Sequence, residues 1–314
     1  MRQTDASPLR NWTPDRLPDL TGKTYIITGG NSGIGFEAAK LLATHGANVE
    51  IACRDQTKAE VAVAEIASAG RGHAGAIPLD LADLSSVREA ARIITDRFGK
   101  IDALVNNAGV MQPPYATTRD GFELQFGVNH LAHFLLSGLL RGVVEAAGGR
   151  IVVTSSIAHK NGRINFDDLN AAKRYSATAA YFQSKLANLL FALELDRRLR
   201  AAHSPATALA CHPGVSHTNL QSSGPRGVWK AAYSLIMPVM SQSAAAGAVP
   251  TVLAAAATEA KPGGYYGPTG AGEFKGPVGD AEIGRQALDR EAARRLWDVS
   301  EELTGLSWEL APAT

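Results

Sequence analysis

Tyr181 and Lys185 are the two residues whose types and spacing most clearly suggest proton transfer. They stand four positions apart in a stretch with helical spacing, so both side chains lie on one face of a helix. A nearby ammonium lowers the pKa of a tyrosine from about 10, and a lowering of about two units corresponds to about 2.7 kcal/mol. Such a tyrosine can give a proton to a carbonyl oxygen or take one from an alcohol. The Y-x-x-x-K pattern is common in helices, so its weight depends on the motifs around it.

A glycine-rich segment, TGGNSGIG at 28–35, follows a short apolar run and opens a helical pattern. Three of its glycines allow a sharp turn and the close approach of a pyrophosphate, and the helix that follows points its N–H groups and positive dipole end at the phosphates. A strand before the turn and a helix after it are the context of a dinucleotide site, whereas an ordinary tight turn is the alternative. The residues expected at this site are Gly29, Asn31, Ser32, Gly33, Ile34 and Gly35.

The end of the second predicted strand, at 48–53, indicates which dinucleotide binds. An acidic residue at this place accepts hydrogen bonds from the ribose 2′-hydroxyl of NAD. Cys53 occupies the place instead and Arg54 follows, whose planar guanidinium suits a 2′-phosphate. Asp55 is interpreted as the N-cap of the next helix, and Lys58 as a source of further positive charge. The pattern predicts NADP(H) as the cofactor, with a solvated Arg54 at the start of the helix as the alternative.

The glycine spacing G-x-x-x-G-x-G occurs together with NNAG at 106–109, two serines at 155–156 and YFQSK at 181–185. In this order and spacing the motifs resemble the short-chain dehydrogenase/reductase family, over residues 20–270 or so of the chain. The sugar-nucleotide epimerase branch is disfavoured because it needs a glycine at Ser32. The resemblance implies a single-domain Rossmann fold and reversible hydride transfer between a nicotinamide and a carbonyl or alcohol carbon.

The resemblance assigns catalytic roles to four residues. Tyr181 is the acid or base, and Lys185 both lowers its pKa and holds the nicotinamide ribose. Ser156, chosen over Ser155, supports the reacting oxygen. Asn129 kinks its helix and holds a water in line with the lysine.

Further residues are assigned to the cofactor by the same resemblance. An Asp-Leu pair lies beside the adenine, with a plain helix cap as the alternative for the Asp. The first asparagine of NNAG ties neighbouring strands together, and the Ala-Gly pair leaves room for the ribose. A Pro-Gly segment packs against the nicotinamide, and a threonine bonds its carboxamide. These positions are Asp80, Leu81, Asn106, Ala108, Gly109, Pro213, Gly214, Val215 and Thr218.

Within the family, SSIAH at 155–159, the long gap before Tyr181, Arg54 and FQSKLANLLF at 182–191 resemble the retinol dehydrogenase-like group. That resemblance implies a small apolar carbonyl or alcohol substrate. Many members of the group carry an N-terminal membrane anchor, which is not predicted here. Family members pair through two long helices, here 122–147 and 177–202, which implies a homodimer or homotetramer.

The elements that must position these residues alternate between short apolar strands and amphipathic helices. The alternation predicts an α/β fold, a doubly wound parallel sheet of about seven strands with helices on both faces. The predicted domain spans 21–305, between a leader at 1–20 and a tail at 306–314, and a segment near 219–240 is expected to form a substrate lid or a small surface helix. The predicted strands are 23–28, 48–53, 74–79, 101–105, 150–154, 207–211 and 264–267, and the predicted helices are 34–45, 56–69, 83–98, 122–147, 177–202 and 282–303.

Composition excludes several classes of partner. A net charge of +1 gives no electrostatic footprint for nucleic acid or an anionic membrane. The two cysteines, Cys53 and Cys211, form neither a disulfide framework nor a metal site. The first twenty or so residues contain no apolar run, so neither a signal peptide nor a membrane anchor is predicted and a cytoplasmic location is expected. The richness in Ala, Gly and Arg suggests a bacterial source.

The sequence therefore predicts an NADP(H)-dependent oxidoreductase in which carbonyl reduction is the favoured direction. One alternative is a non-catalytic NADP(H)-binding redox sensor, which has no need of Ser156, Tyr181 and Lys185. The other is an NAD-dependent alcohol dehydrogenase. His159 and His212 are further acid–base candidates, but both are interpreted as structural or substrate-lining because Tyr181 already fills that role.

Overall fold

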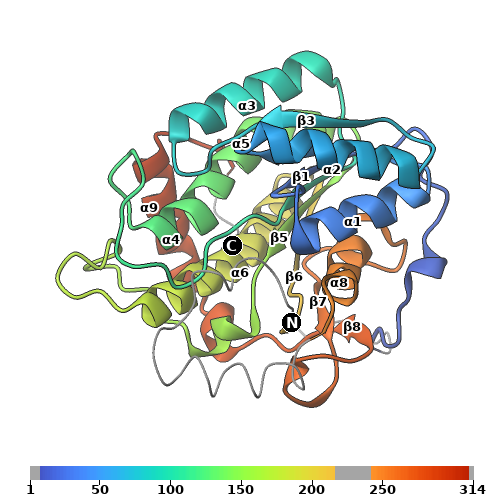
Figure 1. Ribbon diagram of the computed structural model, residues 1–314. Coiled ribbons are helices and arrows are strands. Elements are labelled where there is room, and N and C mark those ends of the chain that lie inside the picture. Colours follow the sequence, from blue (N-terminus) through green and yellow to red (C-terminus); the bar gives the residue numbers. More distant parts are fainter. Residues whose placement is uncertain (1–7, 216–241, 311–314) are drawn as a thin grey trace.

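The computed structural model describes residues 8–215 and 242–310, which form a central sheet covered by helices on both faces (Figure 1). The sheet has eight strands in the order β3-β2-β1-β4-β5-β6-β7-β8. Seven strands run parallel, and β8 pairs antiparallel with β7 at the edge. The strands are β1 Thr24–Thr28, β2 Asn48–Cys53, β3 Ala74–Pro78, β4 Ala103–Asn106, β5 Arg150–Thr154, β6 Thr207–Cys211, β7 Tyr265–Pro268 and β8 Val278–Asp280. The predicted doubly wound α/β fold is confirmed, with one short edge strand more than expected.

The helices divide into two layers because neighbouring residues of each buried strand point to opposite faces. In β1, Ile27 packs with α1, α2 and α8, whereas Ile26 packs with α3, α5, α6 and α9. Both isoleucines are completely buried. The helices are α1 Gly33–Thr44, α2 Gln56–Ala69, α3 Leu84–Arg97, α4 Leu124–Phe126, α5 Ala132–Glu145, α6 Ala177–Ala201, α8 Ala244–Ala256 and α9 Arg290–Thr304.

The strand order reverses beside β1, which pairs with β2 on one side and with β4 on the other. In β1, Ile26 lies opposite Glu50 of β2 and Leu104 of β4. Ligands of open α/β sheets bind at the carboxyl ends of the strands, next to such a reversal. The segments that leave β1 to β6 at this edge carry predicted site residues.

The predicted helix 122–147 is a composite of three elements. α4 and α5 are joined by a π-helical turn, Gly127–Leu131, which contains Asn129. In that turn the N–H of Ala132 bonds to the carbonyl of Gly127, one residue further back than in an α-helix. Such π turns widen a helix locally and often occur at functional sites.

The residues before β1, predicted as a leader, pack on the domain from residue 9 onward. Trp12 is 1% exposed, and its backbone N–H donates to the carbonyl of Val278 at 2.9 Å. Leu17 and Leu20 are also buried. This segment therefore covers the sheet edge that β8 forms.

The C-terminal segment, predicted as a tail, packs into the core up to residue 310. Trp308 is 2% exposed, and its ring lies 5.4 Å from that of Phe134 and 5.0 Å from that of Trp297. The guanidinium of Arg198 on α6 donates to the carbonyl of Leu310 at 3.1 Å. This segment and α9 pack on α6. Self-association through the long helices stays a prediction.

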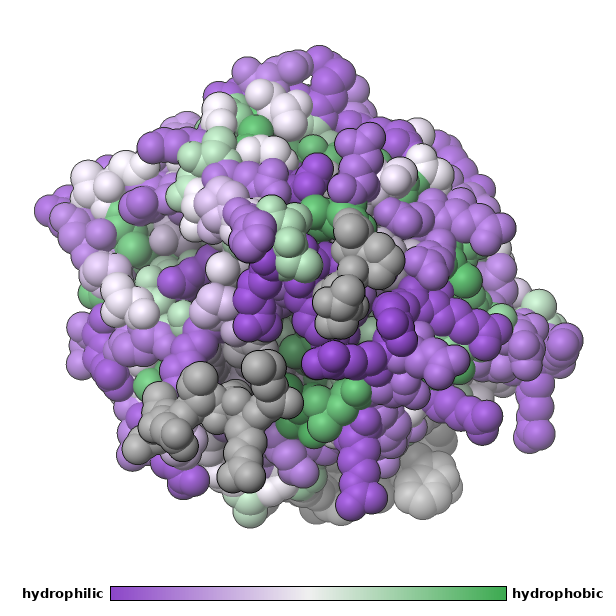
Figure 2. All heavy atoms as spheres, turned by 180° about the vertical axis from the view of Figure 1, so that it is seen from behind, coloured by the Kyte–Doolittle hydropathy of each residue, from purple (hydrophilic) through white to green (hydrophobic). Residues whose placement is uncertain are grey.

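The face of the molecule seen from behind is mostly hydrophilic, and its apolar residues form small separate patches (Figure 2). Among the described residues, the large apolar side chains counted as exposed are Val61, Tyr115 and Leu288. No helix within 8–215 or 242–310 has the length and apolar character needed to cross a membrane. The expected lid at 219–240, and Thr218, lie outside the described residues.

Replacing Trp308 by alanine tests the role of the C-terminal segment. We expect the free energy of unfolding to fall by about 3–5 kcal/mol, because a large buried ring is removed and a cavity remains. Leu288→Ala is the control, since that side chain is 59% exposed and its removal should cost less than about 0.5 kcal/mol. Urea unfolding followed by circular dichroism measures both. Equal effects of the two substitutions would contradict a core role for Trp308.

Candidate active site

The glycine turn after β1 presses its backbone against the end of β4. Gly29 has a positive φ of 66°, and a Cβ on Gly35 would lie 2.5 Å from Asn107 Nδ2 and 2.6 Å from the Gly29 carbonyl oxygen. Neither position accepts a side chain. The first backbone bond of α1 runs from the N–H of Phe36 to the carbonyl of Ser32, so the preceding N–H groups remain for a ligand. The hydroxyl of Ser32 does not cap the helix. This arrangement fits a dinucleotide pyrophosphate.

A single hydroxyl group joins β1 to β4 behind this turn. Thr28 Oγ1 accepts the N–H groups of Asn107 at 2.9 Å and Ala108 at 3.0 Å. Asn107 Nδ2 also donates to the Thr28 carbonyl at 2.9 Å. The strand-tying role expected of Asn106 is therefore performed by Asn107, because the Asn106 side chain donates to Ser137 Oγ on α5 at 2.7 Å.

The end of β2 carries a buried thiol, an ion-paired carboxylate and an exposed guanidinium. Cys53 is buried, and burial raises the pKa of its thiol to about 11, so it carries no negative charge near neutral pH. Asp55 caps α2 by accepting the N–H of Lys58 at 3.1 Å, as predicted, and also forms an ion pair with the Lys58 ammonium at 2.8 Å. Lys58 is thus not an independent positive charge. Arg54 is exposed and forms no ion pair with any described residue.

The predicted adenine residues follow β3. Asp80 Oδ1 accepts the N–H of Ala82 at 3.0 Å, and Leu81 is buried. Asp83, not Asp80, caps α3 by accepting the N–H of Ser85 at 2.8 Å. The alternative of a plain helix cap for Asp80 is therefore wrong.

Lys185 lies in the interior between α6 and the end of β5. It is 5% exposed, and its ammonium donates to the Thr154 carbonyl at 3.2 Å and lies 5.9 Å from the centre of the Tyr181 ring. Burial lowers the pKa of Lys185 to about 8. A Cβ on Gly109 would lie 3.7 Å from the lysine Nζ, so the end of β4 and the catalytic helix meet here. The structure thus brings Tyr181, Lys185 and Gly109 together.

The two serines after β5 differ in their surroundings. Ser155 is buried, and its hydroxyl donates to the Lys185 carbonyl at 2.7 Å. Ser156 is half-buried, and its oxygen accepts the N–H of Ala158 at 3.1 Å, so its own proton remains to be donated. Ser156 is the serine that can support a reacting oxygen.

Asn129 connects the segment after β4 to the catalytic helix. Its Oδ1 accepts the N–H of Val110 at 2.8 Å, and its Nδ2 donates to the Val110 carbonyl at 3.0 Å and to Ser184 Oγ at 2.9 Å. Ser184 in turn donates to the Tyr181 carbonyl at 2.9 Å. The side chain is therefore fully engaged in positioning, and the water-holding role stays a prediction.

His159 and His212 are neutral residues of the interior. Burial lowers the pKa of both, that of His212 to about 3. His159 Nε2 accepts the N–H of Gly284 at 2.9 Å, and Nδ1 donates to the Ser156 carbonyl at 2.6 Å. Their placement agrees with the structural interpretation.

The segment after β6 is held in a turn beside the sheet. Gly214 has a positive φ of 64°, and a Cβ there would lie 2.3 Å from the Phe274 carbonyl oxygen. The N–H of Val215 donates to the same oxygen at 2.8 Å, and Gln242 Nε2 donates to the Pro213 carbonyl at 2.8 Å.

No group of three His, Cys, Asp or Glu side chains placed to hold a metal occurs in the described part of the chain.

Four residues of this arrangement were missed by the sequence reasoning: Thr28, Asn107, His133 and Ser184. Thr28 and Asn107 stand inside the glycine and NNAG motifs, and Ser184 stands inside YFQSK, so their positions were available as signals. His133 carries no comparable local signal. Its Nε2 lies 2.9 Å from Thr28 Oγ1 and its Nδ1 lies 3.0 Å from the Asn129 carbonyl oxygen, so its role depends on how α5 is placed beside the end of β1.

A glycine turn, a buried lysine beside a tyrosine and a serine at the next strand end define a class of nicotinamide-dependent oxidoreductase. The chain matches the family model of the short chain dehydrogenases over residues 23–227. The protein belongs to the short-chain dehydrogenase family. Within it the chain is retinol dehydrogenase-like, since it is 44% identical over 295 residues to human retinol dehydrogenase 13, with 91% of this chain and 86% of the relative covered.

Solved structures share the fold. A crystal structure of a protein from Mycobacterium paratuberculosis has 42% sequence identity and a TM-score of 0.80, covering 96% of this chain and 100% of that one. A short chain dehydrogenase from Burkholderia cenocepacia in complex with NADP has 29% identity and a TM-score of 0.60, covering 75% and 91%. A 3-ketoacyl-(acyl-carrier-protein) reductase from Brucella melitensis complexed with NADH has 28% identity and a TM-score of 0.52, covering 65% and 80%.

The lowered pKa of Lys185 predicts a pH dependence of stability in the protein without cofactor. The pKa of this lysine is 10.5 in the unfolded chain and about 8 in the folded protein. Between these values the unfolded state binds more protons, so the free energy of unfolding should rise with pH, by about 1.4 kcal/mol for each unit between the two pKa values.

Urea unfolding of the wild type and of Lys185→Met over this pH range measures the effect. The variant lacks the titrating group, while all other lysines titrate in both proteins. The difference in free energy between the two should therefore change across the window. A difference that stays constant would contradict the lowered pKa.

Proposed function

We propose that this protein is an NADP(H)-dependent oxidoreductase that interconverts a small apolar carbonyl compound and its alcohol, with reduction as the favoured direction. The observation that carries the proposal is the convergence of the glycine turn, Tyr181, Lys185 and Ser156 at one edge of the sheet. The bound nicotinamide supplies or accepts the hydride. The protein positions the substrate and moves the proton.

The proton step follows from the surroundings of Tyr181. The Lys185 ammonium, 5.9 Å from the tyrosine ring, favours the phenolate over the neutral phenol. During reduction the Tyr181 hydroxyl gives its proton to the carbonyl oxygen, and during oxidation the phenolate takes the proton of the alcohol. The Ser156 hydroxyl donates to the same substrate oxygen and holds it beside the tyrosine.

Three features of the β2 end support NADP(H) over NAD(H). Cys53 stays uncharged, Asp55 is ion-paired with Lys58, and Arg54 forms no ion pair with any described residue. A guanidinium in this position binds a 2′-phosphate through charge-assisted hydrogen bonds. Solved relatives carry NADP or NADH, so the choice for this chain rests on these residues.

The retinol dehydrogenase relatives support an apolar substrate. A redox sensor that only binds the cofactor has no use for a buried lysine beside a tyrosine, because burying an ammonium is costly. The presence of that pair favours catalysis. Cytoplasmic location and assembly as a homodimer or homotetramer stay predictions from the sequence.

Tyr181→Phe separates the enzyme from the sensor. We expect kcat for reduction of an apolar aldehyde to fall by about 10²–10⁴-fold, because the acid is removed, while the Kd for NADPH is unchanged. Tyr175→Phe is the matched control, since its hydroxyl donates to the Pro113 carbonyl at 2.8 Å rather than to a reacting atom. Stopped-flow reduction and fluorescence titration give the two quantities. Undiminished turnover in the Tyr181 variant would remove the proposed mechanism.

Arg54→Ala tests the cofactor preference. We expect NADPH to bind about 10- to 100-fold more weakly, the loss of a hydrogen bond to a charged group, with no change for NADH. Arg71→Ala is the control, because Arg71 is an exposed cation beyond the far end of α2, about 20 Å of helix away. Equal weakening of both cofactors, or tighter binding of NADH by the wild type, would instead favour the NAD-dependent alcohol dehydrogenase.

A further inference from the structure

His133, in the first turn of α5, lies between the cofactor turn and the catalytic helix. It is 1% exposed. Its Nε2 lies 2.9 Å from Thr28 Oγ1, and its Nδ1 lies 3.0 Å from the Asn129 carbonyl oxygen. Both ring nitrogens are therefore engaged, one with each side of the site.

The neighbours of Thr28 determine which nitrogen carries the proton. Both lone pairs of the Thr28 hydroxyl accept backbone N–H groups, those of Asn107 and Ala108. Its proton must therefore be donated, and His133 Nε2 at 2.9 Å is a better acceptor than the Val105 carbonyl at 3.4 Å. Nδ1 then carries the ring proton and donates it to the Asn129 carbonyl. Burial lowers the pKa of His133 to about 4, which keeps this neutral form at physiological pH.

The chain of hydrogen bonds continues from Asn129 to the catalytic helix. The Asn129 amide donates to Ser184 Oγ at 2.9 Å, and Ser184 donates to the Tyr181 carbonyl at 2.9 Å. Thr28, Asn129 and Ser184 are completely buried. Buried hydrogen bonds, joined through the Asn129 residue itself, thus link the end of β1 to the backbone of Tyr181.

We propose that His133 is a positioning residue that sets the catalytic helix relative to the bound cofactor, through Thr28 on one side and Asn129 on the other. This inference rests on the proposed function. The two side chains differ in what they fix. Thr28 holds the backbone of 107–108 beside the glycine turn, and Asn129 holds Ser184 on α6. Loss of the imidazole leaves both ends without their common partner.

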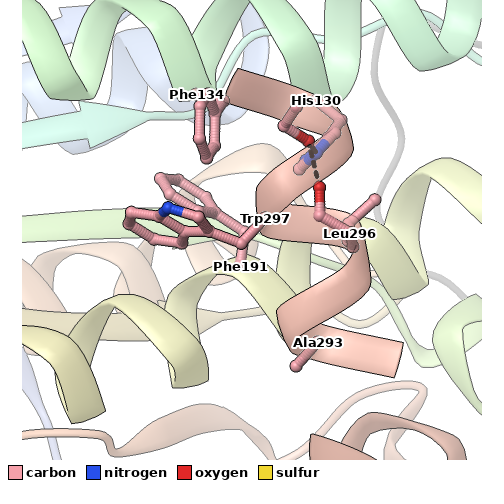
Figure 3. A pocket seen from close by; sticks show the side chains of 7 residues that line it. His130, Phe134, Phe191, Ala293, Leu296 and Trp297 are labelled. Atoms are coloured by element: carbon pink, nitrogen blue, oxygen red, sulfur yellow. Dashed lines mark hydrogen bonds between the residues drawn. The ribbon is translucent and has the colours of Figure 1, made fainter. Parts of the chain in front are cut away.

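His130 offers a matched control on the same continuous helix. It is equally buried, at 1% exposed, and its Nε2 lies 2.9 Å from Ser300 Oγ of α9. It lies among aromatic side chains, with its ring 6.0 Å from that of Phe191 (Figure 3). A substitution here removes a buried histidine and its hydrogen bond to Ser300, does not touch the glycine turn, and meets α6 at Phe191, ten residues after Tyr181.

The experiment compares His133→Phe with His130→Phe at saturating cofactor. A misplacement of about 1 Å costs about 10²-fold in rate, so we expect a fall of about this size in kcat per folded molecule for His133→Phe alone. Both variants should show a lower urea midpoint. A wild-type kcat in folded His133→Phe, or an equal fall in His130→Phe, would overturn the proposal.

Two further variants test the two ring nitrogens separately and are used if His133→Phe does not fold. His133→Asn places an amide where Nδ1 lies and keeps a donor for the Asn129 carbonyl. His133→Gln places an amide near Nε2 and keeps an acceptor for the Thr28 hydroxyl. Each should retain part of the wild-type kcat, and full activity in both would contradict a role that needs both ends.

A second measurement does not depend on turnover. Hydrogen exchange of the Tyr181 and Lys185 amides is followed with and without NADPH, or NADH if that binds more tightly. Binding should slow exchange in the wild type and in His130→Phe but not in His133→Phe. If the wild type shows no turnover but His133→Phe alone lacks the slowing, the inference is supported while the proposed function fails. Equal slowing in all three proteins would overturn the inference, and binding of neither cofactor would overturn both.

Discussion

The hydroxyl of Thr28 accepts two backbone N–H groups from the end of β4, and the rest of the site depends on this junction. Two parallel strands that diverge at a reversal of strand order leave backbone groups unpaired at their ends. Here those groups are joined through one side chain, so the strand ends lie close enough to form a cradle. The same closeness excludes a side chain at Gly35. The glycine motif is thus a consequence of this packing as well as of phosphate binding.

Burial decides the charge state of most groups around this cradle. Burial lowers the pKa of Lys185 to about 8, keeps Cys53 a thiol, and keeps His133 and His212 neutral. The site therefore holds one buried cation beside a tyrosine and no buried anion among these groups. In the proposed reaction, a negative charge that develops on the tyrosine oxygen is favoured by that imbalance. The scaffold supplies the electrostatics before any substrate arrives.

The sequence was sufficient for features with a local signal. Strand β2 and helix α2 were predicted with their observed bounds. The apolar pattern of each element and the residue that caps α2 lie within one short stretch of sequence. Strand β8 has three residues and therefore no period to detect. The exchange of roles between Asn106 and Asn107 could not be predicted, because strand pairing alone decides which amide faces β1. The place of His133 depends on three elements meeting, which no local pattern encodes.

The packing of the C-terminal segment on α6 imposes an order on folding during synthesis. Vectorial translation produces the cofactor half, with its glycine turn, long before residue 310 leaves the ribosome. The bond from Arg198 to Leu310 and the burial of Trp308 cannot form until then. A nascent chain would consequently pack α8 on α1, beside the glycine turn, before the C-terminal segment covers its catalytic helix. Closure of the core around α6 would thus be one of the last events of biogenesis.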